Sequence, residues 1–142
     1  DLNMIVENSI NAIWNDVRQK ASIDRFYGRL SLVPCDPLRM QTGLVDLLMN
    51  VIKTFKSPKE IKVQTRMGDE QAEILVITSK PPKSKNGKET SPLSQEGYES
   101  HIRPKLNTVY SVIEEHHGEI KIDYQNPEQF SIILSLPAKP PA

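Results

Sequence analysis

Residues 33–55 of the chain read VPCDPLRMQTGLVDLLMNVIKTF, and this stretch decides the fold. Asp36 is able to cap free helix amides, and Pro37 suits the first helical position because its missing N–H has no partner there anyway. Apolar residues then recur at steps of three and four as far as Phe55, before Ser57-Pro58. The stretch therefore predicts an amphipathic helix from Pro37 to Phe55.

The chain on either side of this helix predicts a helix and several strands. Residues 1–20 carry apolar side chains at helical spacing, and residues 22–33 look extended. After the central helix the period changes to two: residues 61–67 alternate between apolar and polar side chains, as on a half-buried strand. Residues 74–77 are apolar on both faces, which indicates a central strand.

The last third of the chain predicts a long loop, a helix and two strands. Residues 79–100 are polar and rich in Pro, Gly and Ser, so we expect a lid loop over about 80–101 that is poorly ordered or collapsed. A third helix follows over about 103–117, with Gly118 at its expected stop. Strands at 120–124 and 130–136 complete the pattern.

This order of elements predicts an α/β fold. The expected architecture is a two-layer sandwich, in which a mixed, mostly antiparallel sheet carries three helices on one face. We expect a single domain over residues 1–137, with residues 138–142 as a flexible tail.

Composition excludes several classes of protein. The chain has 142 residues, 18 basic and 18 acidic side chains, and one cysteine, Cys35. A balanced charge gives no general attraction to nucleic acid, and one cysteine excludes a disulfide framework or a multi-cysteine zinc site. No apolar run approaches the roughly 20 residues of a membrane helix, so we expect no direct membrane insertion.

Several local sequences resemble one family in the correct order along the chain. The chain is similar to the catalytic ATP-binding domain of sensor histidine kinases, whose superfamily includes gyrase, the ninety-kilodalton heat-shock chaperone and mismatch-repair ATPases. The resemblance implies the Bergerat-type ATPase fold and a role in a two-component phosphorelay. It rests on the beginning of the chain (1–7), the capped helix start (33–39), the asparagine-box helix (44–53), the last helix and its turn (112–120), and the final strand (130–137).

The asparagine box of that family corresponds to Asp46, Asn50 and Lys53. The resemblance implies that Asn50 holds the magnesium bridging the nucleotide phosphates, that Asp46 handles water or protons, and that Lys53 neutralises phosphate. Spacings of four and three place the three side chains on one helical face. Such polar spacing also arises on the exposed face of any amphipathic helix.

Both glycine-rich boxes of the family are lost in this chain, which makes the domain degenerate. The adenine-binding box would place an Asp and two Gly where this sequence has Thr78, Lys80 and Pro82. The phosphate-wrapping glycines are replaced at three positions of the second box, which carry the cationic side chains of His101, Arg103 and Lys105. Those cations attract phosphate, but their bulk blocks the close backbone approach that glycine permits.

Two further residue types have ordinary structural interpretations. The family carries a histidine near the end of its last helix for packing and capping, which fits the pair His116 and His117. Cys35 lies in a turn without a neighbouring His or Cys in sequence, so we expect no catalytic nucleophile.

Three functions remain open from the sequence. The first is a degenerate domain that keeps the fold, binds no cofactor, and contacts its own helical-hairpin phosphotransfer domain and a response regulator. The second is a divergent active kinase that binds ATP and Mg²⁺ through Asn50 and Lys53. The third is a small-ligand sensor that reuses the emptied pocket. The resemblance implies a cytoplasmic domain, as the cytosolic part of a larger sensor protein.

Overall fold

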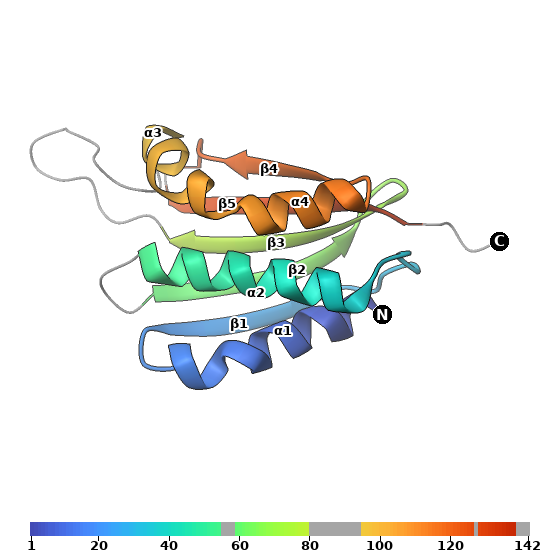
Figure 1. Cartoon of the computed structure of the whole chain (residues 1–142), viewed down its shortest axis with the longest axis horizontal. Helices are drawn as coiled ribbons and strands as arrows, with labels where there is room; N and C mark the ends of the chain where they lie inside the picture. Colours follow the sequence, from blue (N-terminus) through green and yellow to red (C-terminus); the bar gives the residue numbers. More distant parts are fainter. Residues whose placement is uncertain (55–58, 80–94, 127, 139–142) are drawn as a thin grey trace, which may run out of the picture.

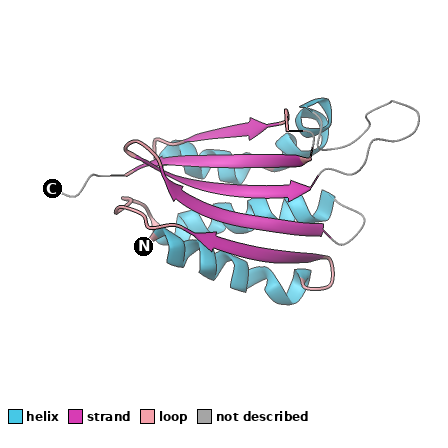
Figure 2. Cartoon of the chain, turned by 180° about the vertical axis from the view of Figure 1, so that it is seen from behind, coloured by secondary structure: helices cyan, strands magenta, loops and turns pink. Residues whose placement is uncertain are grey.

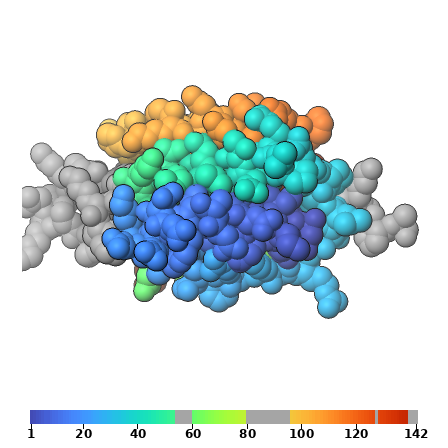
Figure 3. Space-filling view, turned by 60° about the horizontal axis from the view of Figure 1, so that its bottom comes forward, coloured from blue at the N-terminus to red at the C-terminus, as the bar shows by residue number. Residues whose placement is uncertain are grey.

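The computed structural model describes residues 1–54, 59–79, 95–126 and 128–138. A five-stranded sheet carries a layer of helices on one face (Figure 1). Three longer helices form that layer, and Figure 3 shows them side by side as blue α1, green-to-cyan α2 and orange α4. They are α1 (Leu2–Val17), α2 (Pro37–Thr54) and α4 (Asn107–Glu115). The predicted two-layer α/β sandwich is confirmed.

The sheet is mixed and mostly antiparallel, as predicted. The strand order is β1-β2-β3-β5-β4; β1 and β2 run parallel, and the other neighbours are antiparallel. Seen from behind, the second face of the sheet carries none of the helices that the structure describes (Figure 2). The strands are β1 (Ala21–Tyr27), β2 (Lys59–Met67), β3 (Gln71–Ser79), β4 (Glu119–Asp123) and β5 (Gln129–Pro137).

The core lies between the sheet and the helical layer. Side chains of a strand alternate between faces, so every second residue of β3 and β5 points toward the helices. Leu75 is also buried, although it lies on the opposite face of β3 from that core, which agrees with the prediction of a central strand for residues 74–77. The fully buried residues of β3 and β5 that pack in the core are Ala72, Ile74, Val76, Phe130, Ile132, Leu134 and Leu136.

The deciding helix α2 begins as its sequence predicts. The carboxylate oxygen Oδ1 of Asp36 accepts hydrogen bonds from the backbone N–H of Leu38 (3.1 Å) and of Arg39 (3.2 Å), while Pro37 is the first helical residue. Midway along α2, a Cβ at Gly43 would lie only 3.2 Å from that of Val112. The small residue at position 43 therefore lets α2 and α4 pack closely.

The last part of the predicted lid is helical rather than a loop, and it is collapsed onto the core. Residues 95–105 form three short turns: α3 (Gln95–Gly97), the π-helical turn η1 (Tyr98–Ile102) and the 3-10 turn η2 (Arg103–Lys105). Tyr98 and Ile102 are each only 1% exposed, so these turns are packed against the core. The regular helix α4 accordingly begins at Asn107 rather than at residue 103. Residues 80–94 lie outside the described part of the chain.

The end of α4 differs from its predicted stop in one detail. The left-handed backbone conformation falls at His117 (φ 61°) rather than at Gly118. The N–H of Gly118 bonds the carbonyl of Ile113 (2.9 Å), which closes the last turn. Glycine is needed there because an added Cβ would clash with the backbone carbonyl oxygen of Ser135 on β5.

We predict that Gly118→Ala lowers the free energy of unfolding by about 1–3 kcal/mol, because β5 or the turn must shift to admit the methyl group. The matched change His117→Gly relieves a positive φ and should raise the free energy of unfolding by up to about 1 kcal/mol. Urea unfolding of both variants measures these effects. A Gly118→Ala domain as stable as the wild type would show that the turn is not sterically constrained.

Candidate functional site

The asparagine-box residues lie in the C-terminal half of α2. The amide Nδ2 of Asn50 donates to the backbone carbonyl of Asp46 (2.8 Å) and to its carboxylate Oδ1 (3.0 Å). The predicted spacing of four residues therefore brings these two half-buried side chains together. Lys53, one turn further on, is exposed.

Asn50 also reaches across to the segment before α4. Its Nδ2 lies 3.3 Å from the backbone carbonyl of Lys105, at the last residue of η2. The amide group thus links the end of α2 to the turn that leads into α4. This contact occupies the side chain within the protein.

Asp46 faces the beginning of α4. Burial raises the pKa of its carboxyl, while hydrogen bonds from the Asn50 amide and the Val109 backbone N–H act in the opposite direction. Val109 lies in the first turn of α4, where helix N–H groups have no intrahelical partner. The second carboxylate oxygen, Oδ2, is buried and has no hydrogen-bond partner among the described residues.

Tyr98 anchors the turns that precede α4. Its ring lies 5.8 Å from that of Phe130 and 5.9 Å from that of Tyr124, measured between centroids. Its hydroxyl lies 2.8 Å from the hydroxyl of Tyr110 on α4. Burial and then the Tyr110 hydrogen bond raise the pKa of Tyr98, so the phenol stays neutral. An aromatic cluster therefore fixes η1 between α4 and the sheet.

The three cationic residues at the positions that the resemblance assigns to the second glycine box do not converge. His101 and Lys105 are exposed. The Arg103 guanidinium lies 3.5 Å from the centre of the Tyr110 ring, and its Nη1 donates to Asn107 Oδ1 (3.2 Å). Arg103 thus packs against α4.

Of the three residues at the positions that the resemblance assigns to the adenine box, only Thr78 belongs to the described residues; Lys80 and Pro82 fall outside them. Thr78 is 2% exposed near the end of β3 and pairs in register with Phe130 on β5. Its Oγ1 is buried and finds no hydrogen-bond partner within the described chain. Because Phe130 contacts Tyr98, the aromatic cluster lies next to Thr78.

His116 has the structural role that the resemblance implies. Its Nδ1 lies 2.7 Å from the carbonyl of Val112, and its Nε2 lies 3.0 Å from the backbone N of Asp36. Donation from Nδ1 and acceptance at Nε2 require a neutral ring. His116 therefore ties the end of α4 to the beginning of α2, while His117 is exposed.

Cys35 and metal-binding clusters are the remaining candidates for chemistry. Cys35 is half-buried, and burial raises the pKa of its thiol, which disfavours the nucleophilic thiolate. Within the residues that the structure describes, no group of three or more His, Cys, Asp or Glu side chains could hold a metal ion.

Sequence reasoning missed the role of Tyr98. The signal was present, because Tyr98, Ile102 and Leu106 recur at steps of four, as on one helical face. Pro92 and Gly97 obscured it by giving the segment the composition of a loop.

Comparison with known proteins adds the fold family. No protein-family model matches the sequence, and no curated protein matches it. Solved structures do match: the nucleotide-free catalytic domain of histidine kinase ThkA has a TM-score of 0.70 at 21% identity, covering 96% of this chain and 91% of that one. The mycobacterial sensor histidine kinase MprB has a TM-score of 0.71 at 18% identity, covering 99% and 96%. The chain has the fold of a histidine kinase catalytic domain.

Two further findings concern a solved complex of the same fold and the length of the helices. ThkA in complex with the response regulator TrrA also matches, with a TM-score of 0.72 at 18% identity, covering 98% of this chain and 41% of that one. No helix in the described part of the chain is both long and apolar enough to span a membrane.

We predict that Asp46→Asn changes how stability depends on pH. Because the folded pKa of Asp46 lies above its ordinary 3.8, its contribution to stability is full below that pH and is lost as the pH rises through the folded pKa. The variant should therefore gain stability relative to the wild type as the pH rises from about 3 to about 7. Urea unfolding across this range measures the difference.

The same substitution at the exposed Asp16 serves as the control for Asp46→Asn. If the difference in free energy of unfolding between Asp46→Asn and the wild type stayed constant with pH, the raised pKa of Asp46 would be contradicted.

Proposed function

We propose that this chain is a degenerate ATPase-like domain of a two-component signalling protein. It keeps the histidine kinase catalytic fold but does not bind ATP usefully. Its role is to contact other proteins: the helical hairpin that carries the phospho-accepting histidine, and a response regulator.

The packing of Tyr98 is the single observation that carries this proposal. The resemblance places adenine next to position 78, and Phe130, the register partner of Thr78, is already covered by the buried Tyr98 ring. A base could enter there only if η1 moved away. Thr78 also lacks the carboxylate that the family uses to bind the adenine amino group.

Asp46 gives electrostatic support to the proposal. The resemblance places the phosphates at the beginning of the last helix, where the Val109 N–H lies beside the Asp46 carboxylate. A phosphate at this place would meet a like charge. The protein's own carboxylate thus takes one of the helix N–H groups that would otherwise favour an anion.

Magnesium does not rescue binding in this proposal. Mg²⁺ in nucleotide sites is usually held by one or two side chains together with the substrate phosphates. Asp46 and Asn50 supply oxygen ligands of the correct type, but their contribution depends on a nucleotide held by other residues. The residues present therefore do not fit a bound ATP–Mg²⁺ complex.

A divergent nucleotide-binding domain is the second candidate, and one observation favours it. Asp46 Oδ2 and Thr78 Oγ1 are both buried without a hydrogen-bond partner in the described chain. Buried polar atoms usually have partners, so a ligand could supply them. We rank this candidate second because each of these side chains is already covered by the protein.

Calorimetric titration of ATP with Mg²⁺ into the purified domain tests the proposal. We expect no saturable binding at concentrations up to about 1 mM, which corresponds to a binding free energy weaker than about −4 kcal/mol. Thr78→Asp should restore little affinity, because Tyr98 and the Arg103 segment still cover the site.

Asn50→Ala is the matched control in the same titration. Micromolar binding by the wild type that disappears in Asn50→Ala would overturn the proposal and favour the divergent kinase. Equal heats for wild type and Asn50→Ala, without saturation, are the result that the proposal predicts.

A further inference from the structure

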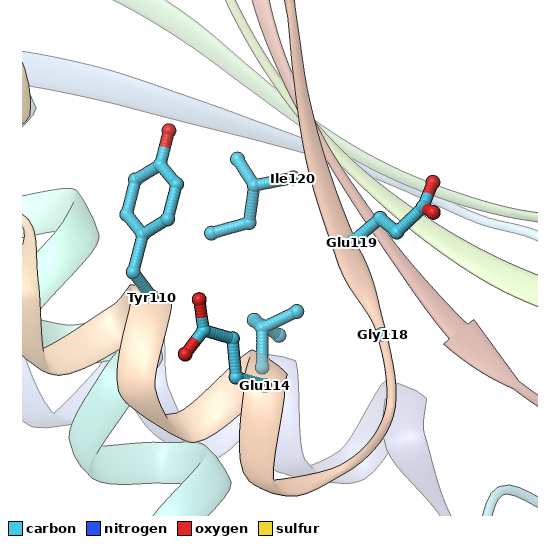
Figure 4. A pocket seen from close by; sticks show the side chains of 6 residues that line it. Tyr110, Glu114, Gly118, Glu119 and Ile120 are labelled. Atoms are coloured by element: carbon cyan, nitrogen blue, oxygen red, sulfur yellow. The ribbon is translucent and has the colours of Figure 1, made fainter.

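A pocket of about 290 Å³ lies between α4 and the edge strand β4 (Figure 4). Its apolar lining includes Ile113 from α4 and Ile120 from β4, and Tyr110 forms one wall. None of its lining residues belongs to α2, so it is separate from the Asp46–Asn50 pair. The remaining lining residues are Glu114, Gly118 and Glu119.

Glu114 gives this pocket a negative charge. Figure 4 shows its carboxylate in the space between Tyr110 and Ile120. No ion-pair partner for Glu114 exists among the described residues, whereas its neighbour Glu115 is paired with Arg39 at 2.6 Å. Glu119 points away from α4, on the other side of the strand.

The pocket opens beside an unpaired strand edge. Strand β4 is the last of the sheet and pairs only with β5. Alternate residues of an edge strand leave their backbone N–H and C=O groups free for another strand. A helix alongside such an edge forms a groove in which a peptide can add as a strand and place alternate side chains in pockets.

The carboxylate of Glu114 selects a basic occupant for the groove. Glu114 is the acidic side chain that faces the groove, because the exposed side chains of β4 (Glu119, Lys121 and Asp123) alternate with Ile120 and Ile122 and lie on the other face of the strand. The guanidinium of Arg103 is stacked on Tyr110 and hydrogen-bonded to Asn107, and it forms no ion pair with Glu114. A partner side chain with a long apolar stem and a positive end fits both the lining of the pocket and its carboxylate.

We propose that the groove between α4 and β4 binds an extended segment of a partner protein. The segment adds as a strand to the free edge of β4 and places a lysine or arginine side chain in the pocket against Glu114. This inference rests on the part of the proposed function that assigns protein contacts to the domain. It does not depend on the loss of ATP binding.

Selection of peptides by the wild-type domain tests this site. The probe is a phage-displayed library of random peptides about ten residues long, which is enough to pair along one strand. We expect enriched peptides with a basic residue at a fixed position between β-branched residues. Failure to enrich any peptide, or enrichment of peptides without a basic residue, would overturn the proposal.

Charge reversals at Glu114 and Glu119, which both line the pocket, provide matched variants. Glu114→Lys should weaken binding of a selected peptide by about tenfold or more, because it places like charges together. Glu119→Lys, whose side chain points away from the pocket, should change the affinity by less than about threefold. Both positions are exposed, and an unchanged unfolding curve confirms that each variant is folded. Equal losses in the two variants would contradict a specific role for Glu114.

Amide exchange separates strand addition from other modes of binding. On addition of the peptide, free-edge amides of β4 should gain protection, because they become hydrogen-bonded to the new strand. Protection elsewhere without protection at β4 would overturn the proposal.

The outcomes for this groove and for the proposed function are distinguishable. If the domain binds neither ATP nor peptide, the proposed degenerate function stands and the proposal of a peptide-binding groove is refuted. If the domain binds both ATP and peptide, the proposed degenerate function is refuted and the proposal of a peptide-binding groove stands.

Discussion

The burial of Tyr98 is the interaction on which the site depends. A buried tyrosine removes about 150–250 Å² from water, which corresponds to roughly 4–6 kcal/mol as an upper estimate. The hydroxyl contact with Tyr110 avoids the cost of about 1–3 kcal/mol for an unsatisfied buried polar group. Tyr98 therefore holds residues 95–105 against the sheet, and the contacts of Asn50 and Arg103 follow from that position.

Helices α2 and α4 are joined at both ends, which supports this arrangement. At one end, His116 and the Arg39–Glu115 pair connect the end of α4 to the beginning of α2. At the other end, the Asn50 amide bonds the carbonyl of Lys105 just before α4. The side chains that resemble a nucleotide site thus help to hold two antiparallel helices together. Likeness of fold alone does not assign a nucleotide-binding role to these side chains.

The sequence predicts the layers of this fold well because they depend on periodic burial. The capped start of α2 at Asp36 and the alternation along β2 are local signals, and both elements form as predicted. The segment around Tyr98 could not be predicted in the same way. Its short turns are stabilised by Phe130 and Tyr124, which lie more than 20 residues later in the chain. Tertiary contacts override a loop-like composition at this place.

The same reasoning explains which parts of the candidate site could be predicted. The proximity of Asp46 and Asn50 follows from helical spacing alone. The conformations of η1 and η2 determine where the side chains of His101, Arg103 and Lys105 lie. Sequence position alone therefore does not predict that Arg103 stacks on Tyr110. The pocket beside Glu114 lies between α4 and β4, which are connected by the turn at Gly118. Its shape depends on how the helix packs against the strand, so the sequence alone does not predict it.

Amide exchange at Tyr98 and Ile102, with and without ATP–Mg²⁺, tests the central claim most directly. If these turns are part of the stable core, their amides exchange as slowly as the amides of β3 and β5. Addition of nucleotide then leaves their exchange rates unchanged. Fast exchange of η1 in the free domain, together with a change in its rate when ATP–Mg²⁺ is added, would contradict the account. That result would mean that the turns open to admit a nucleotide.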